Sequence, residues 1–347
     1  MKKPLCLVTG ACGFMGSHMV EVLHERGYRI RATDLGAAYE VDDRRRGCFP
    51  SVCKRLGVEF VPADLTDPAS LDAAVRDVQL CFHIAAVFSY SAPFSRLERV
   101  NYDGTRELVT RLLARPSFSK MVHWGAGGVY RLTSTMPLTE ESPIDPGNDY
   151  LRSKSMSEQL VLDYGVDQGL RHSILRPTSV YGPRGVYGAG QLLRVAARGP
   201  AAMCPTNWHQ RLPFVHVRDV CQAALFLAEN PAADGEVYNV SDSSELSTVE
   251  FFRFVSELCG KPFVPLPPVG VGTVKALLAP VARGLKWLSD NVTHQPPWLE
   301  APVVEYLGLD VAYSNQKLLD AGYELTYPDA RQGLSDTILW YQRNGWL

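Results

Sequence analysis

The feature that most constrains this chain is a run of glycines close to its start. Residues 9–16 read TGACGFMG and lie between a short apolar stretch, 5–8, and an amphipathic stretch, 17–26. A strand that runs into a helix through glycines brings free backbone N–H groups and the positive end of a helix dipole together. The glycines also let the backbone approach a pyrophosphate closely. The sequence therefore predicts a dinucleotide site at Gly10, Gly13, Phe14, Met15 and Gly16.

The order of apolar and amphipathic stretches predicts the fold. Apolar runs alternate with stretches of helical periodicity, which is typical of βαβ units and a parallel sheet. The expected strands are 5–8, 28–33, 58–61, 80–84, 121–124 and 172–175, and the expected helices are 17–26, 70–77, 100–114 and 150–168. Beyond Pro177 the pattern loosens, with loops expected over 181–190 and 199–213, a helix over 219–228 and a strand over 236–240.

These elements predict an α/β protein of the Rossmann type, a doubly wound parallel sheet with a smaller C-terminal α/β part. We assign residues 1–180 to a cofactor-binding domain, to which 212–240 return. Residues 181–211 and 241–347 are assigned to a substrate-binding part.

Composition narrows the class of protein. The formal net charge of −2 and the isoelectric point near 6.5 offer no excess positive charge for a nucleic acid. The 8 cysteines lack paired CxxC spacing, so we expect reduced thiols and no metal site. The apolar run near the start is shorter than a secretory signal requires, which favours a cytoplasmic protein.

A carboxylate follows the second expected strand. Dinucleotide-binding sequences place an acid roughly 20 residues beyond the glycine loop, where it accepts hydrogen bonds from the adenosine ribose, and Asp34 occupies this position. A carboxylate there repels a 2′-phosphate, so NAD(H) is expected in preference to NADP(H). Arg44, Arg45 and Arg46 are the rival observation: they would clasp such a phosphate, unless they form a solvated loop.

At this point the residues resemble the extended short-chain dehydrogenase/reductase family, part of the NAD-dependent epimerase/dehydratase superfamily. The likeness extends over nearly the whole chain, from the TGxxGxxG loop to the segments 176–183 and 215–220. It implies that NAD contacts a set of residues beyond the glycine loop and Asp34, namely Asp64, Leu65, Ile84, Ala85, Ala86, Asn101, Tyr150, Lys154 and Pro177.

The resemblance places the chemistry at Tyr150 and Lys154. Four residues make about one helical turn, so the phenol and the ammonium share a helix face. The lysine is expected to lower the pKa of the Tyr150 phenol and to hold the nicotinamide ribose. The tyrosine then exchanges the proton of an alcohol while hydride moves to or from the cofactor.

One position departs from the family pattern. The family carries a serine or threonine four residues before the tyrosine of a Val-Tyr motif, and here that residue is Ala126, ahead of Tyr130. Alanine has no hydroxyl to hold a substrate oxygen. Thr133, Ser134 or Thr135 from the following loop, or a water molecule, would have to replace it. Redox activity is still expected, with an incomplete proton relay.

Two features favour a hydrophobic small-molecule substrate. Ser179 stands where nucleotide-sugar members of the family commonly carry an asparagine. Apolar residues also recur at helical spacing over 274–288, around Pro280. This segment is interpreted as a core-facing helix, as a lid over the substrate or as an element in contact with a membrane surface. The chain most resembles the 3β-hydroxysteroid and sterol-4-carboxylate dehydrogenases.

Three functions are therefore open. The first is an NAD(H)-dependent oxidoreductase that interconverts a hydroxyl and a ketone on a sterol-like or long-chain substrate. The second is a nucleotide-sugar epimerase or dehydratase. The third is an NAD-binding protein without redox turnover, which Ala126 favours and the intact Tyr150 and Lys154 oppose. A homodimer is left open.

Overall fold

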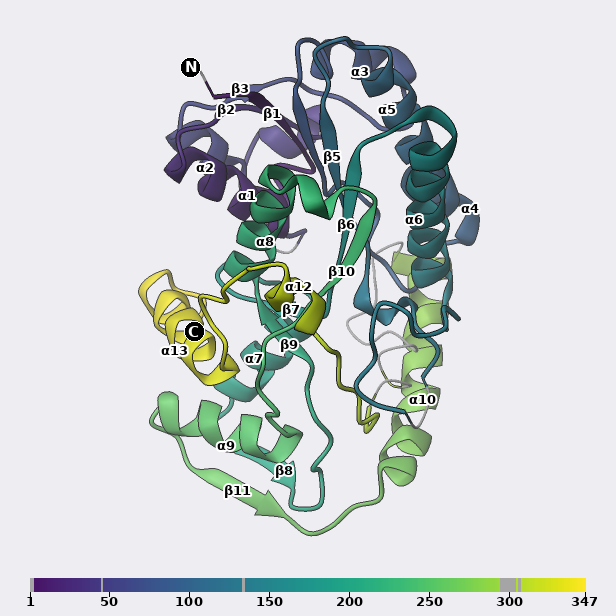
Figure 1. Ribbon diagram of the computed structural model, residues 1–347. Helices are drawn as coiled ribbons and strands as arrows, with labels where there is room; N and C mark the ends of the chain where they lie inside the picture. The colour runs from purple at the N-terminus through teal and green to yellow at the C-terminus, as the bar shows by residue number, and fades with distance from the viewer. Residues whose placement is uncertain (1–2, 45, 133–134, 294–303, 305–306) are drawn as a thin grey trace.

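A seven-stranded parallel sheet forms the centre of the molecule (Figure 1). The structure is a computed structural model that describes residues 3–44, 46–132, 135–293, 304 and 307–347. The strands are β1 (Leu5–Thr9), β2 (Arg29–Thr33), β3 (Glu59–Phe60), β4 (Leu80–His83), β5 (Lys120–Trp124), β6 (His172–Pro177) and β10 (Glu236–Val240). Their order is β10-β6-β5-β4-β1-β2-β3, and all neighbouring strands are parallel. The sheet is doubly wound, as predicted, and its switch point lies between β1 and β4.

Helices cover both faces of this sheet. One face is covered by α1 (Phe14–Glu25), α2 (Pro50–Arg55) and α8 (Val217–Glu229). The other is covered by α3 (Pro68–Ala74), α5 (Gly104–Leu113) and α6 (Asp149–Gln168). Alternate residues of β1 face the two layers, because Cys6 and Val8 belong to the first core and Leu5 and Leu7 to the second. Strands covered on both sides read as continuous apolar runs, which is why their positions were predictable.

The C-terminal part contains two small parallel sheets and several helices. β7 (Ser179–Tyr181) pairs with β9 (Phe214–His216), and β8 (Ala202–Pro205) pairs with β11 (Phe263–Leu266). The helices are α7 (Gly188–Arg198), α9 (Thr248–Leu258), α10 (Val271–Leu288), α12 (Gln316–Asp320) and α13 (Ala330–Arg343). A smaller α/β part is therefore present beside the Rossmann sheet. The expected division of the chain at 180, 211 and 240 stays a prediction.

Several expected elements differ in extent. The expected loop over 199–213 contains β8, and the expected loop over 181–190 already contains the start of α7. The helix expected from residue 100 begins earlier, because α4 (Phe94–Leu97) continues through a π-helical turn, η2 (Glu98–Asp103), into α5. The helix expected from residue 17 begins at Phe14, so the glycine loop runs directly into its first turn.

The apolar stripe over 274–288 lies along one side of α10, but the protein covers only part of it. Val274, Leu278 and Leu285 are half-buried on the side that faces the protein. Leu277 and Val281 instead lie 68% and 45% exposed. The stripe is wide enough to supply both a packed face and an exposed one, and periodicity alone does not separate the two.

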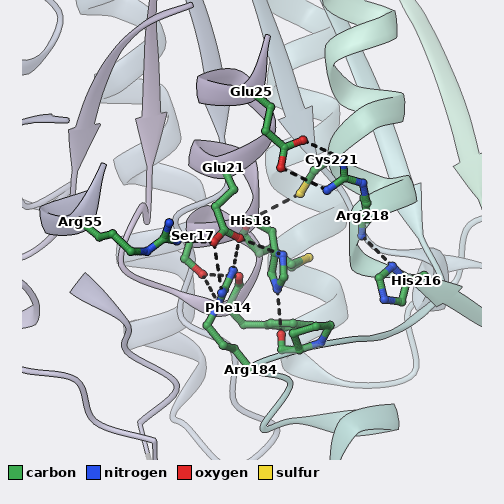
Figure 2. Close-up of polar contacts among 12 residues, drawn as sticks. Phe14, Ser17, His18, Glu21, Glu25, Arg55, Arg184, His216, Arg218 and Cys221 are labelled. Carbon is green, nitrogen blue, oxygen red and sulfur yellow. Dashed lines mark hydrogen bonds and ion pairs between the residues drawn. The ribbon is translucent and has the colours of Figure 1, made fainter. Parts of the chain in front are cut away.

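Polar contacts fix α1 to the C-terminal part (Figure 2). Arg184, in the connection between β7 and α7, forms an ion pair with Glu21 at 2.5 Å. Arg55 of α2 donates to the same carboxylate at 2.8 Å. The His18 ring donates to the carbonyl of Pro183 at 2.8 Å. The helix that begins at the glycine loop is thereby held against the segment that follows β7.

Candidate functional site

A cavity of about 1720 Å³ runs from the glycine loop into the C-terminal part. Pockets for drug-sized ligands measure roughly 300–1,000 Å³, so this cavity has room for a dinucleotide and a second molecule. With the exception of Asn101, the predicted site residues line it: Gly10, Gly13, Phe14, Met15, Gly16, Asp34, Asp64, Leu65, Ile84, Ala85, Ala86, Ala126, Tyr150, Lys154 and Pro177. The fold therefore brings these predicted residues together at one cavity.

The glycine loop tolerates no side chains at two of its positions. Gly10 has φ +66°, and a Cβ there would lie 2.9 Å from the Cα of Ala85. A Cβ on Gly16 would lie 1.9 Å from the carbonyl oxygen of Gly10. The first turn of α1 has no side-chain cap at Gly13, so its N–H groups remain available for an anion. This cradle fits the pyrophosphate of NAD.

Asp34 follows β2, at the rim of the same loop. One carboxylate oxygen accepts the N–H of Cys12 at 3.0 Å, and the other accepts the N–H of Leu35 at 2.8 Å. Burial raises the pKa of the Asp34 carboxyl, and these two hydrogen bonds oppose the rise. The carboxylate is thus held at the place where an adenosine ribose would lie beside the loop.

Two of the three arginines considered for a 2′-phosphate clasp already have partners. Arg44 donates to the carbonyls of Asn344 and Gly345, both at 3.1 Å. Arg46 lines the cavity and pairs with Asp43 at 3.5 Å, while Arg45 lies outside the described residues. A phosphate clasp by all three side chains would first require Arg44 to leave the C-terminal carbonyls.

A buried hydrogen-bond chain that the sequence analysis did not identify holds the turn after β4. Thr9 Oγ1 accepts the N–H groups of residues 84 and 85 at 3.0 and 3.1 Å. Its own proton therefore points to His83 Nδ1, 2.9 Å away, and His83 Nε2 donates to Thr105 Oγ1 at 2.9 Å. Thr105 donates onward to the carbonyl of Asn101 at 2.6 Å. Burial, aided by the charge of Lys154, lowers the pKa of the His83 ring to about 3, so the ring is neutral.

Asn101 lies behind the cavity wall. Its amide accepts the N–H of Val87 at 2.8 Å and donates to the Val87 carbonyl at 3.2 Å. It also donates to Ser153 Oγ at 2.9 Å, and Ser153 donates to the carbonyl of Tyr150 at 2.7 Å. The π-helical turn that contains Asn101 directs its side chain between these two segments. Asn101 thereby supports the Tyr150 backbone through Ser153, and its contact with the cofactor stays a prediction.

Tyr150 and Lys154 lie on the first turns of α6, and both line the cavity. The Tyr150 ring packs edge-on against Phe88, with ring centroids 4.9 Å apart, and against Tyr90 at 5.7 Å. Burial lowers the pKa of the Lys154 ammonium to about 8, and the attraction of Glu158 opposes this. The expected lowering of the Tyr150 pKa is not found. Burial raises the pKa of the phenol, because the aromatic neighbours keep water from the charged form.

Ala126 is held by a buried ion pair. Its N–H donates to Glu158 at 3.3 Å, and the other oxygen of this carboxylate accepts from Arg176 Nε at 2.7 Å. Of the expected replacement hydroxyls, Thr133 and Ser134 lie outside the described residues, and Thr135 is exposed. Thr178 and Ser179 also line the cavity. The Thr178 hydroxyl donates a long hydrogen bond, 3.4 Å, to the carbonyl of Val240.

The sheet and this cavity belong to a known class of cofactor-dependent enzymes. Residues 6–241 match the model of the NAD dependent epimerase/dehydratase family. The chain belongs to this family, as its resemblance to the extended short-chain dehydrogenases/reductases predicted. It is therefore an NAD-dependent enzyme.

Relatives lie on both the sterol and the nucleotide-sugar sides of the family. Sterol demethylase protein B from Methylococcus capsulatus is 30% identical, over 80% of this chain and 82% of that protein. A 3-beta-hydroxysteroid dehydrogenase from Mycolicibacterium neoaurum is 25% identical, over 96% and 90%. UDP-N-acetyl-alpha-D-glucosaminuronate decarboxylase from Bacillus cytotoxicus is 27% identical, over 74% and 80%. The expected resemblance to the sterol branch is confirmed.

Solved structures share the fold. The UDP-glucose 4-epimerase of Thermus thermophilus in complex with NAD superposes with a TM-score of 0.71 at 23% identity, over 97% of this chain and 99% of that one. None of the helices in the described ranges is long and apolar enough to cross a membrane. The expected cytoplasmic location stays a prediction, and a homodimer stays open.

Proposed function

We propose that this enzyme interconverts a hydroxyl and a ketone on a hydrophobic, sterol-like or long-chain substrate, with NAD(H) as cofactor. The observation that supports this most is the position of Tyr150 and Lys154. Both line a single cavity that begins at the glycine loop and continues between apolar side chains of the C-terminal part.

Each residue of the site has a task in this proposal. Bound NAD(H) would accept or supply the hydride. Tyr150 exchanges a proton with the substrate oxygen, and the rings of Phe88 and Tyr90 exclude water from that phenol. With a pKa of about 8, the Lys154 side chain is mostly protonated near neutral pH and stabilises the phenolate as the proton leaves. Asn101, through Ser153, keeps the Tyr150 backbone in place.

The distal part of the cavity supports a hydrophobic substrate. Its lining includes apolar residues of the C-terminal part: Trp208, Leu212, Pro213, Phe252, Leu307 and Leu309. Arg211 also lines it, but its guanidinium forms two hydrogen bonds to Asp310, both at 2.9 Å. Asp310 thereby neutralises a cation that would otherwise attract a diphosphate.

A nucleotide-sugar epimerase or dehydratase is the second candidate. Arg96 and Arg99 line the cavity from α4 and η2, and both are exposed. Two such guanidinium groups would suit a sugar diphosphate. Thermal shift in the presence of NAD(H) distinguishes the candidates, since we expect stabilisation by sterol-like or long-chain ketones and none by UDP-sugars. Stabilisation by a UDP-sugar alone would favour the nucleotide-sugar enzyme over the hydroxyl–ketone oxidoreductase.

The catalytic assignment is tested by Tyr150→Phe. We expect turnover to fall by on the order of 10²–10⁴, the usual contribution of a general acid, while NADH affinity stays nearly the same. Tyr164→Phe is the matched control, because Tyr164 lies on the same helix, and its hydroxyl contacts Thr110 at 3.1 Å, away from the cavity lining. Undiminished turnover in Tyr150→Phe would show that the proton comes from another group.

We further propose that α10 contacts an anionic membrane surface next to the cavity. Its exposed apolar side chains include Leu277 at 68% and Trp287 at 63% exposure. Residues 271–288 contain three cationic side chains, Lys275, Arg283 and Lys286, and no acidic one, the charge pattern of interfacial helices. One end of α10 meets the cavity wall, since Val271 packs on Gly308. Near its other end, Lys286 donates at 3.4 Å to the carbonyl of Ser91, the residue next to Tyr90 of the cavity lining. A hydrophobic substrate would then enter from the lipid.

Sedimentation with phosphatidylglycerol vesicles tests this contact. The wild type should sediment with the vesicles, and Leu277→Glu should not, because a carboxylate cannot enter the acyl region. Val166→Glu is the control, at a residue 87% exposed on α6. Equal sedimentation of Leu277→Glu and the wild type would exclude α10 as the contact.

A further inference from the structure

Residues 185–187, between β7 and α7, touch two separate walls of the cofactor cavity. A Cβ on Gly185 would lie 3.4 Å from Cζ of Phe14, at the start of α1. A Cβ on Gly47, in the connection between β2 and α2, would lie 3.0 Å from Cε2 of Tyr187. The segment therefore spans the dinucleotide site from the first turn of α1 to the connection that follows β2.

The Tyr187 side chain joins the two sides of the switch point. Its hydroxyl donates to the carbonyl of Arg46, beyond β2, at 2.8 Å. Its ring lies beside Phe88, beyond β4, with ring centroids 5.4 Å apart, and Phe88 in turn packs on Tyr150. All four residues line the cavity. Because β2 and β4 lie on opposite sides of β1, the Tyr187 ring crosses the place where a dinucleotide binds in such sheets.

The backbone of this segment is fixed, whereas the Tyr187 ring can move. The carbonyl of Gly185 accepts from the Tyr341 hydroxyl at 3.0 Å, and the carbonyl of Val186 accepts from Arg194 at 2.9 Å. The Tyr187 side chain is 39% exposed, so the core does not enclose it. Rotation about its own side-chain bonds would break its contacts with the two walls while the backbone stays in place.

We propose that the Tyr187 ring is a gate for NAD(H). In the closed position it bridges Arg46 and Phe88 and confines the dinucleotide, and when it rotates away the cofactor enters or leaves. Because the closing contacts are made within the chain, they favour the closed position with or without cofactor. The gate therefore sets the rates of cofactor exchange rather than the affinity. Opening of such gates limits turnover in many enzymes, and this one depends on NAD(H) binding alone, whatever the substrate.

The two contacts of the Tyr187 side chain set the expected size of the effect. A net hydrogen bond and an aromatic ring pair each shift such an equilibrium about five-fold, and together about 30-fold. Tyr187→Ala removes both contacts, so the association and dissociation rate constants of NADH should each rise about 30-fold, while Kd changes less than about two-fold. Tyr187→Phe loses only the hydrogen bond, so both rate constants should rise about five-fold.

The experiment measures both rate constants by stopped-flow fluorescence of NADH with the full-length protein. Association is followed after NADH is mixed with the protein. Dissociation is followed after the protein–NADH complex is mixed with excess NAD. Tyr187→Phe keeps the packed ring, so it tests the gate independently of any effect of Tyr187→Ala on folding.

Tyr327→Phe is the matched control. The Tyr327 hydroxyl donates to Asp336 at 2.9 Å, and this tyrosine lies outside the cavity lining. This variant should keep the wild-type rate constants. Unchanged rate constants in Tyr187→Ala and Tyr187→Phe would overturn the proposal. Faster dissociation with unchanged association would also overturn it, because Tyr187 would then contact bound NADH rather than control its passage.

Discussion

The Ala126→Ser variant should turn over simple ketones faster than the wild type. Ala126 lines the cavity together with Tyr150, and its backbone is extended, with φ −151° and ψ 131°. Any residue adopts such a backbone, so serine fits without strain. The N–H of residue 126 is held by the buried carboxylate of Glu158 at 3.3 Å. The new hydroxyl would therefore project from a position that the protein core already fixes.

The expected size of the gain follows from what one hydroxyl can do. A positioned donor to a developing oxyanion is worth about 10²–10³ in kcat. A serine side chain has three staggered positions, and an introduced hydroxyl is not locked into the one that reaches the substrate oxygen. We therefore expect about a 10- to 100-fold gain in kcat with model ketones, and little change in NADH affinity.

The assay is the initial rate of NADH oxidation over a panel of ketones, with cofactor saturating. Ala37→Ser is the control, because it adds a hydroxyl to the same cavity near Asp34, at the opposite end from Tyr150. The wild type should show weak but measurable activity. A wild type with high ketone turnover that Ala126→Ser lowers would refute this account. It would mean that a second hydroxyl, such as Thr178 or Ser179, already holds the substrate oxygen.

Three further predictions concern the cofactor, the core and pH. NADH should bind more tightly than NADPH in fluorescence titration, because the carboxylate at the loop repels a 2′-phosphate. Asp34→Ala should narrow the difference between the two affinities, and equal affinities in the wild type would contradict this account. Glu158→Gln should lower the free energy of unfolding in urea by about 3 kcal/mol, since it leaves Arg176 buried without its charge partner, whereas Glu25→Gln, at the exposed pair with Arg218, should change it by less than about 1 kcal/mol. Burial lowers the pKa of Lys154 from 10.5 in the unfolded chain to about 8, so between these two pH values the folded state binds fewer protons than the unfolded state. The free energy of unfolding of the wild type should therefore rise from pH 8 to pH 10.5 relative to that of Lys154→Met. Melting temperatures of the two proteins that change in parallel with pH would contradict this.

The sequence determined the cofactor site and the sheet because their signals are local. Gly10 has φ +66°, and a Cβ on Gly16 would overlap a carbonyl oxygen, so only glycine fits at these two positions. The sequence alone therefore identifies both. Strands covered on both faces are mostly apolar, and β1 is buried at every one of its five positions. Tyr150 and Lys154 are a helical turn apart, so their common face also followed from the spacing alone.

The tertiary structure decided whatever depends on residues distant in the chain. One hydrogen-bond chain crosses two strands and a helix and joins Thr9, His83, Thr105 and Asn101. No local sequence pattern predicts such a chain. The pKa of Tyr150 is raised because Phe88 and Tyr90 fold over the phenol, which the spacing of Tyr150 and Lys154 does not reveal. Burial acts through neighbours that only the folded chain brings together.

The same limit applies to α10 and to the cysteines. Periodicity identified the apolar residues of 274–288, but only the packed fold shows that Leu277 is exposed while Leu278 faces the protein. Cys12 and Cys48 are separated by 36 positions in the sequence, and in the folded chain the N–H of the next residue, Phe49, donates to the Cys12 carbonyl at 2.6 Å. The sequence determines which chemical groups the side chains carry. The order of the strands and the packing of helices on the sheet determine which distant side chains meet.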